Sequence, residues 1–455
     1  MHSWFQKRLE IEEMNQRSQS LALKFLGLNA TQSAQALLVQ TFLVLYLLDI
    51  LTFQELGMLF AIQFGLILLL DYPTGALADA VGHKNVLVLA YVSYIGAILF
   101  LLAADSFLGF IPWVILAAIG ASQESGALPA WFDNNYRVTS DDLDKDRRMY
   151  GAFLGKVQVV GRIISATAFI SGGLIAGILS RKILFILQLI LVCVALAVII
   201  LLMHNEKGVE VPPRTLKAYV ERLKGGLEFL ASSHGVLLFF LGIAILAATF
   251  TSIWGAMMLF PFYASYSGSD EYTGLLRAIL FLSGIIWLLY ISKMTKEIQK
   301  PHRILFLSYV MLSIGLPTLV YGFYETIPPP NRFVLISYLA VIILLQWIGI
   351  WFPLQIILQR RIMIELVPDR YRNAVYSLIP TLFTLFGIPF VILAGYIITN
   401  HGFAAGLLLM IVLGSIGISV LGIGLYYLAK PETTDQVPLE QTPADLQKKS
   451  APTSG

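Results

Sequence analysis

The sequence contains twelve apolar stretches, each of about the 20 residues that an α-helix needs to cross a bilayer. Long runs such as 183–202 lack the ten-residue alternation of a membrane barrel and therefore indicate helices. With 57% hydrophobic and 13% charged residues, little chain remains for a soluble domain. We predict an all-α membrane protein with 12 transmembrane helices at roughly 31–49, 55–78, 85–104, 107–132, 151–177, 183–203, 236–262, 273–292, 304–323, 333–357, 375–398 and 405–429.

The distribution of basic residues predicts the orientation of these helices. The stretch before the first span is too charged and too long for a secretory signal peptide. If the amino terminus is cytoplasmic, 25 of the 31 lysines and arginines fall in cytoplasmic segments, and the external loops carry Arg181, Lys182 and Arg332 alone. By the positive-inside rule, both termini are expected in the cytoplasm and the protein in the plasma membrane.

A polar segment at 204–235 divides the spans six and six. It contains a helical pattern with Leu216, Val220, Leu223, Leu227 and Leu230 on roughly one side, as in a helix that tethers two bundles or, alternatively, lies on the membrane surface. The predicted parts are a cytoplasmic segment 1–30, a first bundle 31–203, the linker 204–235, a second bundle 236–429 and a disordered tail 430–455.

Several function classes are disfavoured by composition. The formal net charge of +3 is too small to imply a nucleic-acid partner. Cys193 is the single cysteine, and the six histidines show no metal-ligand spacing. Neither a catalytic motif nor a phosphate-binding P-loop is present. We therefore expect no enzyme activity, no metal, no cofactor and no ATP-driven transport.

A loop with a distinctive pattern of glycines and charged residues follows the second span. The residues Gly75-Ala-Leu-Ala-Asp79-Ala-Val-Gly82-His-Lys84, preceded by Asp71-Tyr-Pro73, resemble the signature G-x-L-A-D-x-x-G-x-[RK] of the major facilitator superfamily (MFS). Two further segments, 125–133 at the end of span four and 365–372 before span eleven, are also similar to that family.

This resemblance implies two pseudo-symmetric six-helix bundles that alternate in exposing a midplane site. Asp79 would contact the amino terminus of span eleven, after Pro368, and close the cytoplasmic ends; the alternative is a solvated turn. We expect Asp79→Ala to reduce transport greatly. The sequence departs from the family at Ala80 and His83, and it lacks the arginine in span four and the full glycine-proline motif in span five that proton-coupled exporters carry, so proton antiport is unsupported.

Charged residues inside the spans are costly, and they usually pair or line water. We predict a network in which Arg162 is balanced by Glu124 or Asp71, with Lys156 nearer the cytoplasmic end, serving either as a proton or substrate site or as a structural ion pair. Arg277 is expected to extend to the external headgroups. Spans one, four, seven and ten line the cavity in the family, which implies Glu124 and the candidate cavity residues Gln40, Trp254, Gln346, Trp347 and Gln355; the alternative for each amide or Trp is helix packing.

The predicted function is secondary transport of a small uncharged or amphiphilic molecule, with efflux favoured, by a monomer that uses H+ or Na+ as coupling ion if any. The alternatives are an importer of a sugar-like or other metabolite, a non-transporting receptor or scaffold, and a membrane-embedded lipid enzyme. The intact loop at Gly75 to Lys84 argues against a receptor, and the lack of clustered catalytic residues argues against an enzyme.

Overall fold

The computed structural model describes residues 7–140, 143–206, 216–327, 329 and 334–429, and these are helices joined by short turns. Within helices, the side chains of 71–80, 216–220, 222–223, 296, 334–338, 340, 345, 369–370, 373–374 and 377 are outside the description. The first half comprises α2 (Gln16–Leu48), α3 (Phe53–Val81), α4 (His83–Ala103), α5 (Phe107–Glu124), α6 (Ala127–Thr139), α7 (Arg148–Ile178) and α8 (Arg181–Leu202). The second comprises α9 (Leu216–Ala231), α10 (His234–Ala248), η1 (Thr249–Met258), α11 (Leu259–Ser267), α12 (Asp270–Met294), η2 (Thr295–Glu297), α13 (Pro301–Val310), η3 (Met311–Gly315), α14 (Leu316–Thr326), α15 (Val334–Leu366), α16 (Asp369–His401) and α17 (Phe403–Ala429).

Twelve helical segments are long and apolar enough to cross a membrane, which confirms the predicted number of spans. The first of them differs at its start, because α2 begins at Gln16, inside the segment 1–30 that was expected to precede the membrane. The Asn15 side chain accepts a hydrogen bond of 2.8 Å from the Ser18 amide and so caps the helix. Hydropathy detects the part of a helix that fits the bilayer and misses a charged extension such as this one.

Three spans are interrupted. Span four bends between α5 and α6 at Gly126, whose φ of +73° favours glycine. Spans seven and nine each contain a π-helical segment, η1 and η3 respectively, where the hydrogen-bond ladder is wider than in an α-helix. Such segments are frequent at functional sites. The interruption at η1 brings Trp254 and its neighbours to the contact between the two halves.

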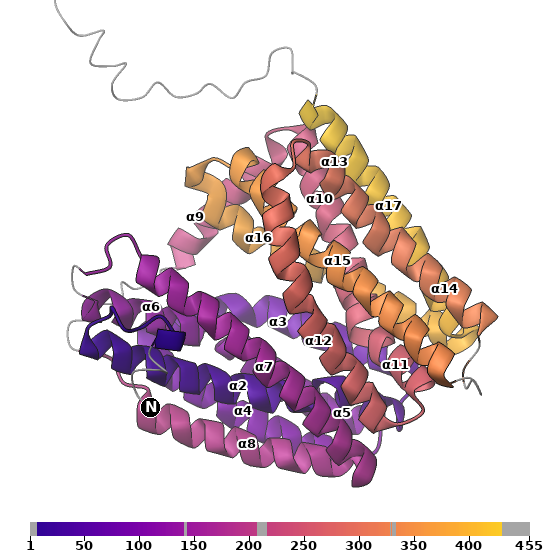
Figure 1. Cartoon of the computed structure of the whole chain (residues 1–455), viewed down its shortest axis with the longest axis horizontal. Helices are drawn as coiled ribbons and strands as arrows, with labels where there is room; N and C mark the ends of the chain where they lie inside the picture. Colours follow the sequence, from indigo (N-terminus) through magenta and orange to yellow (C-terminus); the bar gives the residue numbers. More distant parts are fainter. Residues whose placement is uncertain (1–6, 141–142, 207–215, 328, 330–333, 430–455) are drawn as a thin grey trace, which may run out of the picture.

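The two bundles form a V, meeting at one end and diverging at the other (Figure 1). The buried hydrophobic residues show the same division. One cluster, which includes Phe42 and Phe60 from the first half with Trp254 and Phe262 from the second, spans both bundles. A second cluster contains residues of 9–203 only, and a third contains residues of 230–421 only. We call the shared end the closed end and the other the open end.

Glycines permit the close approach of the bundles at the closed end. The contacts are α3 with α16 and α7 with α12. A Cβ atom on Gly395 would lie 2.5 Å from the carbonyl oxygen of Phe53, and one on Gly173 would lie 2.9 Å from that of Asp270. Gly57 and Gly274, on the opposite helices, likewise face Val391 and Phe169 too closely for any side chain. Both inter-bundle contacts therefore require glycine on each partner helix.

The predicted linker helix is present as α9, and it packs against the first turns of α16, where Phe229 stacks on Tyr371 at 5.5 Å between ring centroids. This contact fits a tether to the second bundle; Leu216, Val220 and Leu223 lie outside the described side chains. The tail 430–455 also lies outside the described residues.

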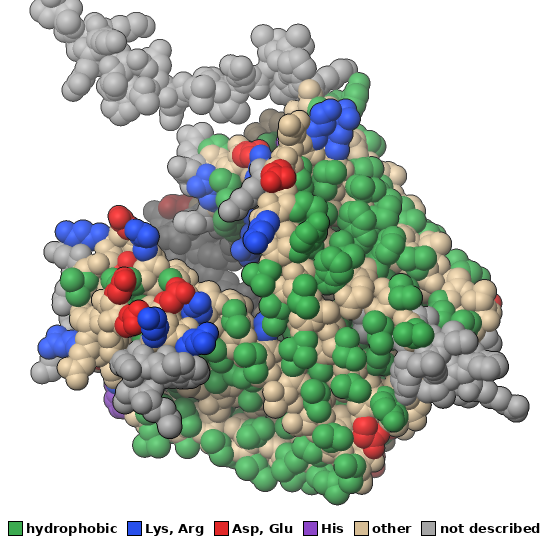
Figure 2. Space-filling model, viewed as in Figure 1, with side chains coloured by type: hydrophobic (Ala, Val, Ile, Leu, Met, Phe, Trp, Pro, Cys, Tyr) green, Lys and Arg blue, Asp and Glu red, His purple; other side chains and the backbone are tan. Residues whose placement is uncertain are grey.

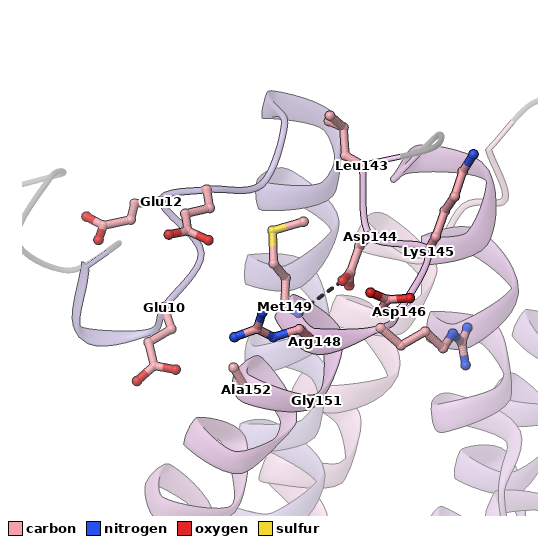
Figure 3. Close-up of a pocket in the computed structure, with 12 residues that line it drawn as sticks. Glu10, Glu12, Leu143, Asp144, Lys145, Asp146, Arg148, Met149, Gly151 and Ala152 are labelled. Carbon is pink, nitrogen blue, oxygen red and sulfur yellow. Dashed lines mark hydrogen bonds between the residues drawn. The ribbon is translucent and has the colours of Figure 1, made fainter.

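At the open end of the first bundle, Asp144 caps the start of α7 (Figure 3). Its carboxylate accepts hydrogen bonds from the amides of Met149 (3.1 Å) and Tyr150 (2.8 Å) and from the Tyr136 hydroxyl (2.9 Å). Desolvation raises the pKa of Asp144, but these donors outweigh it, and the pKa lies below the ordinary 3.8.

We expect Asp144→Ala to lower the free energy of unfolding by about 1–2 kcal/mol, the usual cost of losing a helix cap. Because the pKa of the folded state is lowered, this contribution is complete above pH 3.8 and is lost as the pH falls through the lower value of the folded state. Thermal unfolding of the purified protein between neutral and acid pH measures it. Asp146→Ala, at an exposed position of the same loop, is the control; an equal loss in both variants would refute the capping role.

Candidate functional site

A hollow opens between the bundles on the open side, between α6 and α7 of the first half and α9 and α16 of the second (Figures 1 and 2). Charged side chains gather around its rim on the first bundle, whereas hydrophobic side chains cover the visible flanks of both bundles (Figure 2). The hollow is the candidate pathway, and the closed end is its barrier.

The barrier is fastened by Arg181 at the first turn of α8. Its guanidinium donates to both carboxylate oxygens of Asp270 at 2.9 and 2.8 Å, across the bundle boundary. It also donates to Asp49, at the end of α2, at 2.8 and 2.9 Å and to the Leu45 carbonyl at 3.3 Å. The Arg181 and Asp270 side chains are 23% and 14% exposed, so water screens this pair less than a surface ion pair. In a second contact across the boundary, the backbone N–H of Gln54 donates a hydrogen bond to the Thr399 hydroxyl at 2.8 Å.

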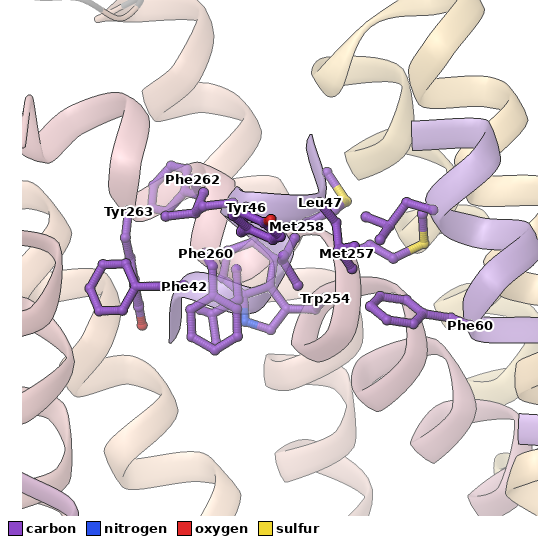
Figure 4. Packing of buried hydrophobic residues seen from close by; sticks show 14 of the residues in the cluster. Phe42, Tyr46, Leu47, Phe60, Trp254, Met257, Met258, Phe260, Phe262 and Tyr263 are labelled. Carbon is purple, nitrogen blue, oxygen red and sulfur yellow. The ribbon is translucent and has the colours of Figure 1, made fainter. Parts of the chain in front are cut away.

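Also at the closed end, aromatic and Met side chains of α2, α3, η1 and α11 fill the space between the bundles (Figure 4). Trp254 is 2% exposed at their centre. Its indole Nε1 is buried without a partner among the described side chains. Predicted as a cavity residue, Trp254 belongs to the closed barrier in this conformation.

Arg277 lies inside the protein. Its guanidinium carbon is 5.3 Å from the ring centroid of Phe169 on α7, 5.2 Å from that of Phe260 on α11 and 4.8 Å from that of Phe281 on its own helix. The expectation that this side chain extends to the headgroups is therefore wrong. Depth counted along a helix does not reveal which face the residue occupies, and this one faces the boundary between the bundles.

The rings compensate Arg277 only in part. Three cation–π contacts of roughly 0.5–2 kcal/mol each are comparable with the cost of a charge within the bilayer, at least about 2.5 kcal/mol, but ring faces do not replace hydrogen-bond acceptors for a guanidinium. The contacts use the faces of the rings, and Nε of Arg277 is buried without a hydrogen-bond partner in the described part of the chain.

The predicted pairing of Arg162 with Glu124 does not form. Arg162, on α7, lies 5.7 Å from the ring centroid of Phe281, on the side facing α12. Glu124 instead accepts hydrogen bonds from the hydroxyls of Tyr94 (2.6 Å) and Tyr91 (3.3 Å) on α4. The two side chains lie on different faces of the first bundle, and their positions along the spans could not show which faces meet. Asp71, the other predicted partner, lies outside the described side chains.

Lys156 also falls outside such a network, because it pairs with Glu10 of the amino-terminal segment at 2.8 Å between Nζ and Oε1. Both side chains are well exposed, so this pair contributes little to stability. The pair joins the amino-terminal segment to α7 at the open end.

Three of the predicted cavity residues hold helices together. Gln346 accepts a 2.5 Å hydrogen bond from the Trp287 indole and donates to Ser283 at 3.2 Å, joining α15 to α12. Trp347 donates to the Met311 carbonyl in η3 at 2.9 Å. Gln355 donates to Tyr309 at 2.9 Å. These contacts agree with the alternative that the three residues serve in helix packing. Gln40, the remaining predicted cavity glutamine, is exposed on α2.

The signature loop is described in part. Gly82 separates α3 from α4 with a φ of +90°, a conformation that favours glycine. Lys84 donates to the Ile200 carbonyl at the end of α8 at 2.7 Å. Gly75 and Asp79 have helical backbones in α3, but their side chains lie outside the description, as do those of Asp369 and Arg370. The contact of Asp79 with span eleven stays a prediction.

Sequence reasoning missed the Arg181 ion pair and the aromatic surroundings of Arg277. A signal existed for the first, because Arg181 is one of three basic residues in the predicted external loops and acidic residues end α2 and begin α12 nearby. For the second, the sequence shows a lone arginine in an apolar span, without indicating its neighbours.

Two six-helix bundles joined by a linker, with a cleft open on one side and a fastened barrier on the other, define a secondary transporter. The sequence matches the family model of the Major Facilitator Superfamily over residues 25–390, and the chain belongs to that family. It is an integral, multi-pass membrane protein, and the family consists of transporters rather than enzymes.

Solved structures of transporters share this fold. The nucleoside transporter NupG is 14% identical, with a TM-score of 0.70 over 90% of this chain and 99% of that chain. A POT family transporter in complex with 5-aminolevulinic acid is 14% identical, with a TM-score of 0.66 over 90% and 99%. The POT family transporter PepTSo is 11% identical, with a TM-score of 0.68 over 90% and 97%. At these identities the likeness shows the fold alone. A comparison with curated proteins finds no match.

Proposed function

We propose that this protein transports a small amphiphilic molecule by alternating access, and that the structure represents its inward-open state. The observation that carries the proposal is the one-sided barrier: Arg181 joins both bundles at the closed end, while the buried clusters at the open end are separate for each bundle. The positive-inside rule places the open end in the cytoplasm. Export is the proposed direction; the inward-open cleft is compatible with it, because a cytoplasmic substrate would bind in this state.

Two spin-labelled pairs test alternating access. Cys193 is exposed and must first be replaced, by Cys193→Ser. Labels at Arg137 and Lys224 report on the open end, and labels at Leu108 and His401 report on the closed end. In nanodiscs, the two distances should change in opposite directions when the equilibrium shifts. If the distance within each labelled pair stays the same under every condition, including with bound substrate, the proposal is refuted.

Flux into and out of proteoliposomes tests transport itself and its direction. Candidate amphiphiles should move only in vesicles that contain the protein, and vesicles sorted by protein orientation should distinguish export from import. Binding without any flux would favour a receptor instead.

Glu124 is our candidate for proton coupling. It lies in the membrane on α5, and the groups facing it are the hydroxyls of Tyr91 and Tyr94 and the Gln32 amide. We expect Glu124→Gln to fold normally, because glutamine keeps an acceptor for these donors, and to abolish the pH dependence of flux. Flux measured across a pH gradient in both proteins tests this; Tyr91→Phe is the control, which keeps the carboxyl group. Unaltered pH dependence in Glu124→Gln would exclude Glu124 as the proton carrier.

A further inference from the structure

The wall between α7, α11 and α12 contains hydrogen-bond donors that lack acceptors. Arg277 forms no ion pair with any described residue, and its Nε is buried without a partner. The Tyr263 hydroxyl lies close enough to this guanidinium to interact with its charge, and the hydroxyl is buried with no partner at hydrogen-bond distance and angle in the described part of the chain. An arginine and a phenol placed together offer N–H and O–H donors, so the group that completes this site is an acceptor, and an anionic one.

A second cation faces the same ring. Phe281 has Arg277 on it at 4.8 Å and Arg162 at 5.7 Å, measured from each guanidinium carbon to the ring centroid. Arg162 forms no ion pair with a described residue either, and it is partly exposed. Leu37 of α2 and Phe281 of α12 both pack against the buried cluster of Ala166, Phe169 and Ala278. The pair therefore lies where helices of both bundles meet, beneath the closed barrier.

We infer that Arg277, with Tyr263 and Arg162, binds the carboxylate of an amphiphilic organic anion whose apolar part contacts Phe169, Phe260 and Phe281. A guanidinium binds a carboxylate through two parallel hydrogen bonds, and the Tyr263 hydroxyl adds a third donor. The three aromatic rings favour an anion with an apolar body over a phosphate, whose additional charge and oxygen atoms would have to be desolvated against them. The inference rests on the proposed function in one respect, since it names the substrate class for that cleft.

Thermal unfolding of the purified full chain in nanodiscs of zwitterionic lipid tests the site without requiring transport. The probes are benzoate and hexanoate, each compared with its uncharged amide, together with inorganic phosphate. The two carboxylates should raise the unfolding temperature in a concentration-dependent way, and the amides and phosphate should not. Equal stabilisation by carboxylate and amide, stabilisation by phosphate alone, or none by either carboxylate would overturn the inference.

Three variants assign the effect. Arg277→Met should weaken carboxylate binding by about tenfold or more, without lowering the unfolding temperature of the unliganded protein, because no described acidic partner is lost. Tyr263→Phe keeps the ring and should weaken binding by a smaller factor. Arg303→Met removes an exposed cation on α13 and should change nothing.

Carboxylate stabilisation that persists in Arg277→Met refutes the site. If Arg277→Met does not fold, Tyr263→Phe decides, and unchanged affinity in that variant is a refutation. The flux assay distinguishes failure of this inference from failure of the proposed function. Carboxylate binding without any flux would support the anion site and refute transport. Flux of uncharged amphiphiles alone would support transport and refute the anion site.

Discussion

Arg181→Ala should move the protein out of the inward-open state. The substitution removes the hydrogen-bonded ion pair that joins Arg181 to Asp270 across the bundles, and hydrogen bonds to charged groups contribute about 1.5–3 kcal/mol. Losing that energy from one state changes the equilibrium constant by roughly 10- to 150-fold. The labels at Leu108 and His401 should then report an opened closed end, and flux should fall because the inward-open state is rarely reached.

Two further variants separate the contact across the bundles from the contact within one bundle. Asp49→Asn weakens only the part of the network inside the first half and should have a smaller effect. The exchange Arg181→Asp with Asp270→Arg restores opposite charges across the boundary and should recover much of the inward-open population. Recovery will be incomplete for two reasons. The carboxylate introduced at position 181 lies near that of Asp49 and is repelled by it. In addition, Asp270 is at the start of α12, where a cation is unfavourable by about 0.3–1 kcal/mol. If Arg181→Ala leaves both label distances unchanged, Arg181 does not control the equilibrium.

Gly274→Val should have an effect of similar size by a steric route. A Cβ on Gly274 would overlap the Phe169 carbonyl and lie 2.9 Å from the Cα of Gly173, so α7 and α12 would have to move apart. Overpacking of this kind costs about 1–3 kcal/mol or more. This cost applies only to the conformation in which the bundles touch at the closed end. We therefore expect the variant to populate conformations in which that end is separated, and transport to fall by about tenfold or more. The label distances and the flux assay measure both effects.

The other inter-bundle contact provides a matched test. Gly395→Val obstructs α16 against Phe53 of α3 and should produce the same phenotype, whereas Gly322→Val on α14, where a Cβ would meet nothing within 4 Å, should behave like the wild type. Normal transport in both Gly274→Val and Gly395→Val would show that the bundles do not need these contacts.

The number and type of elements followed from local pattern. Twelve spans and the linker helix could be predicted because hydropathy over about 20 residues and helical periodicity each act within a short stretch of chain. Resemblance at Gly75 to Lys84 then indicated the family, and the family model matches residues 25–390. The same local signals could not show that α2 begins as early as Gln16.

The partners of the charged and polar side chains depended on which helix faces meet. Arg162 and Glu124 both fall within predicted spans of the first bundle, yet Arg162 lies against Phe281 of the other half and Glu124 against Tyr94 of its own half. Arg181, predicted in an external loop, joins helix ends that are far apart in the chain.

Membrane insertion is a property of each apolar segment alone, so a linear sequence is sufficient to specify it. Pairing of an arginine with a carboxylate or an aromatic ring requires two segments to lie within a few ångströms at one rotation about their axes. That rotation is settled only when all twelve helices pack, as the glycine contacts of α3 with α16 and of α7 with α12 illustrate.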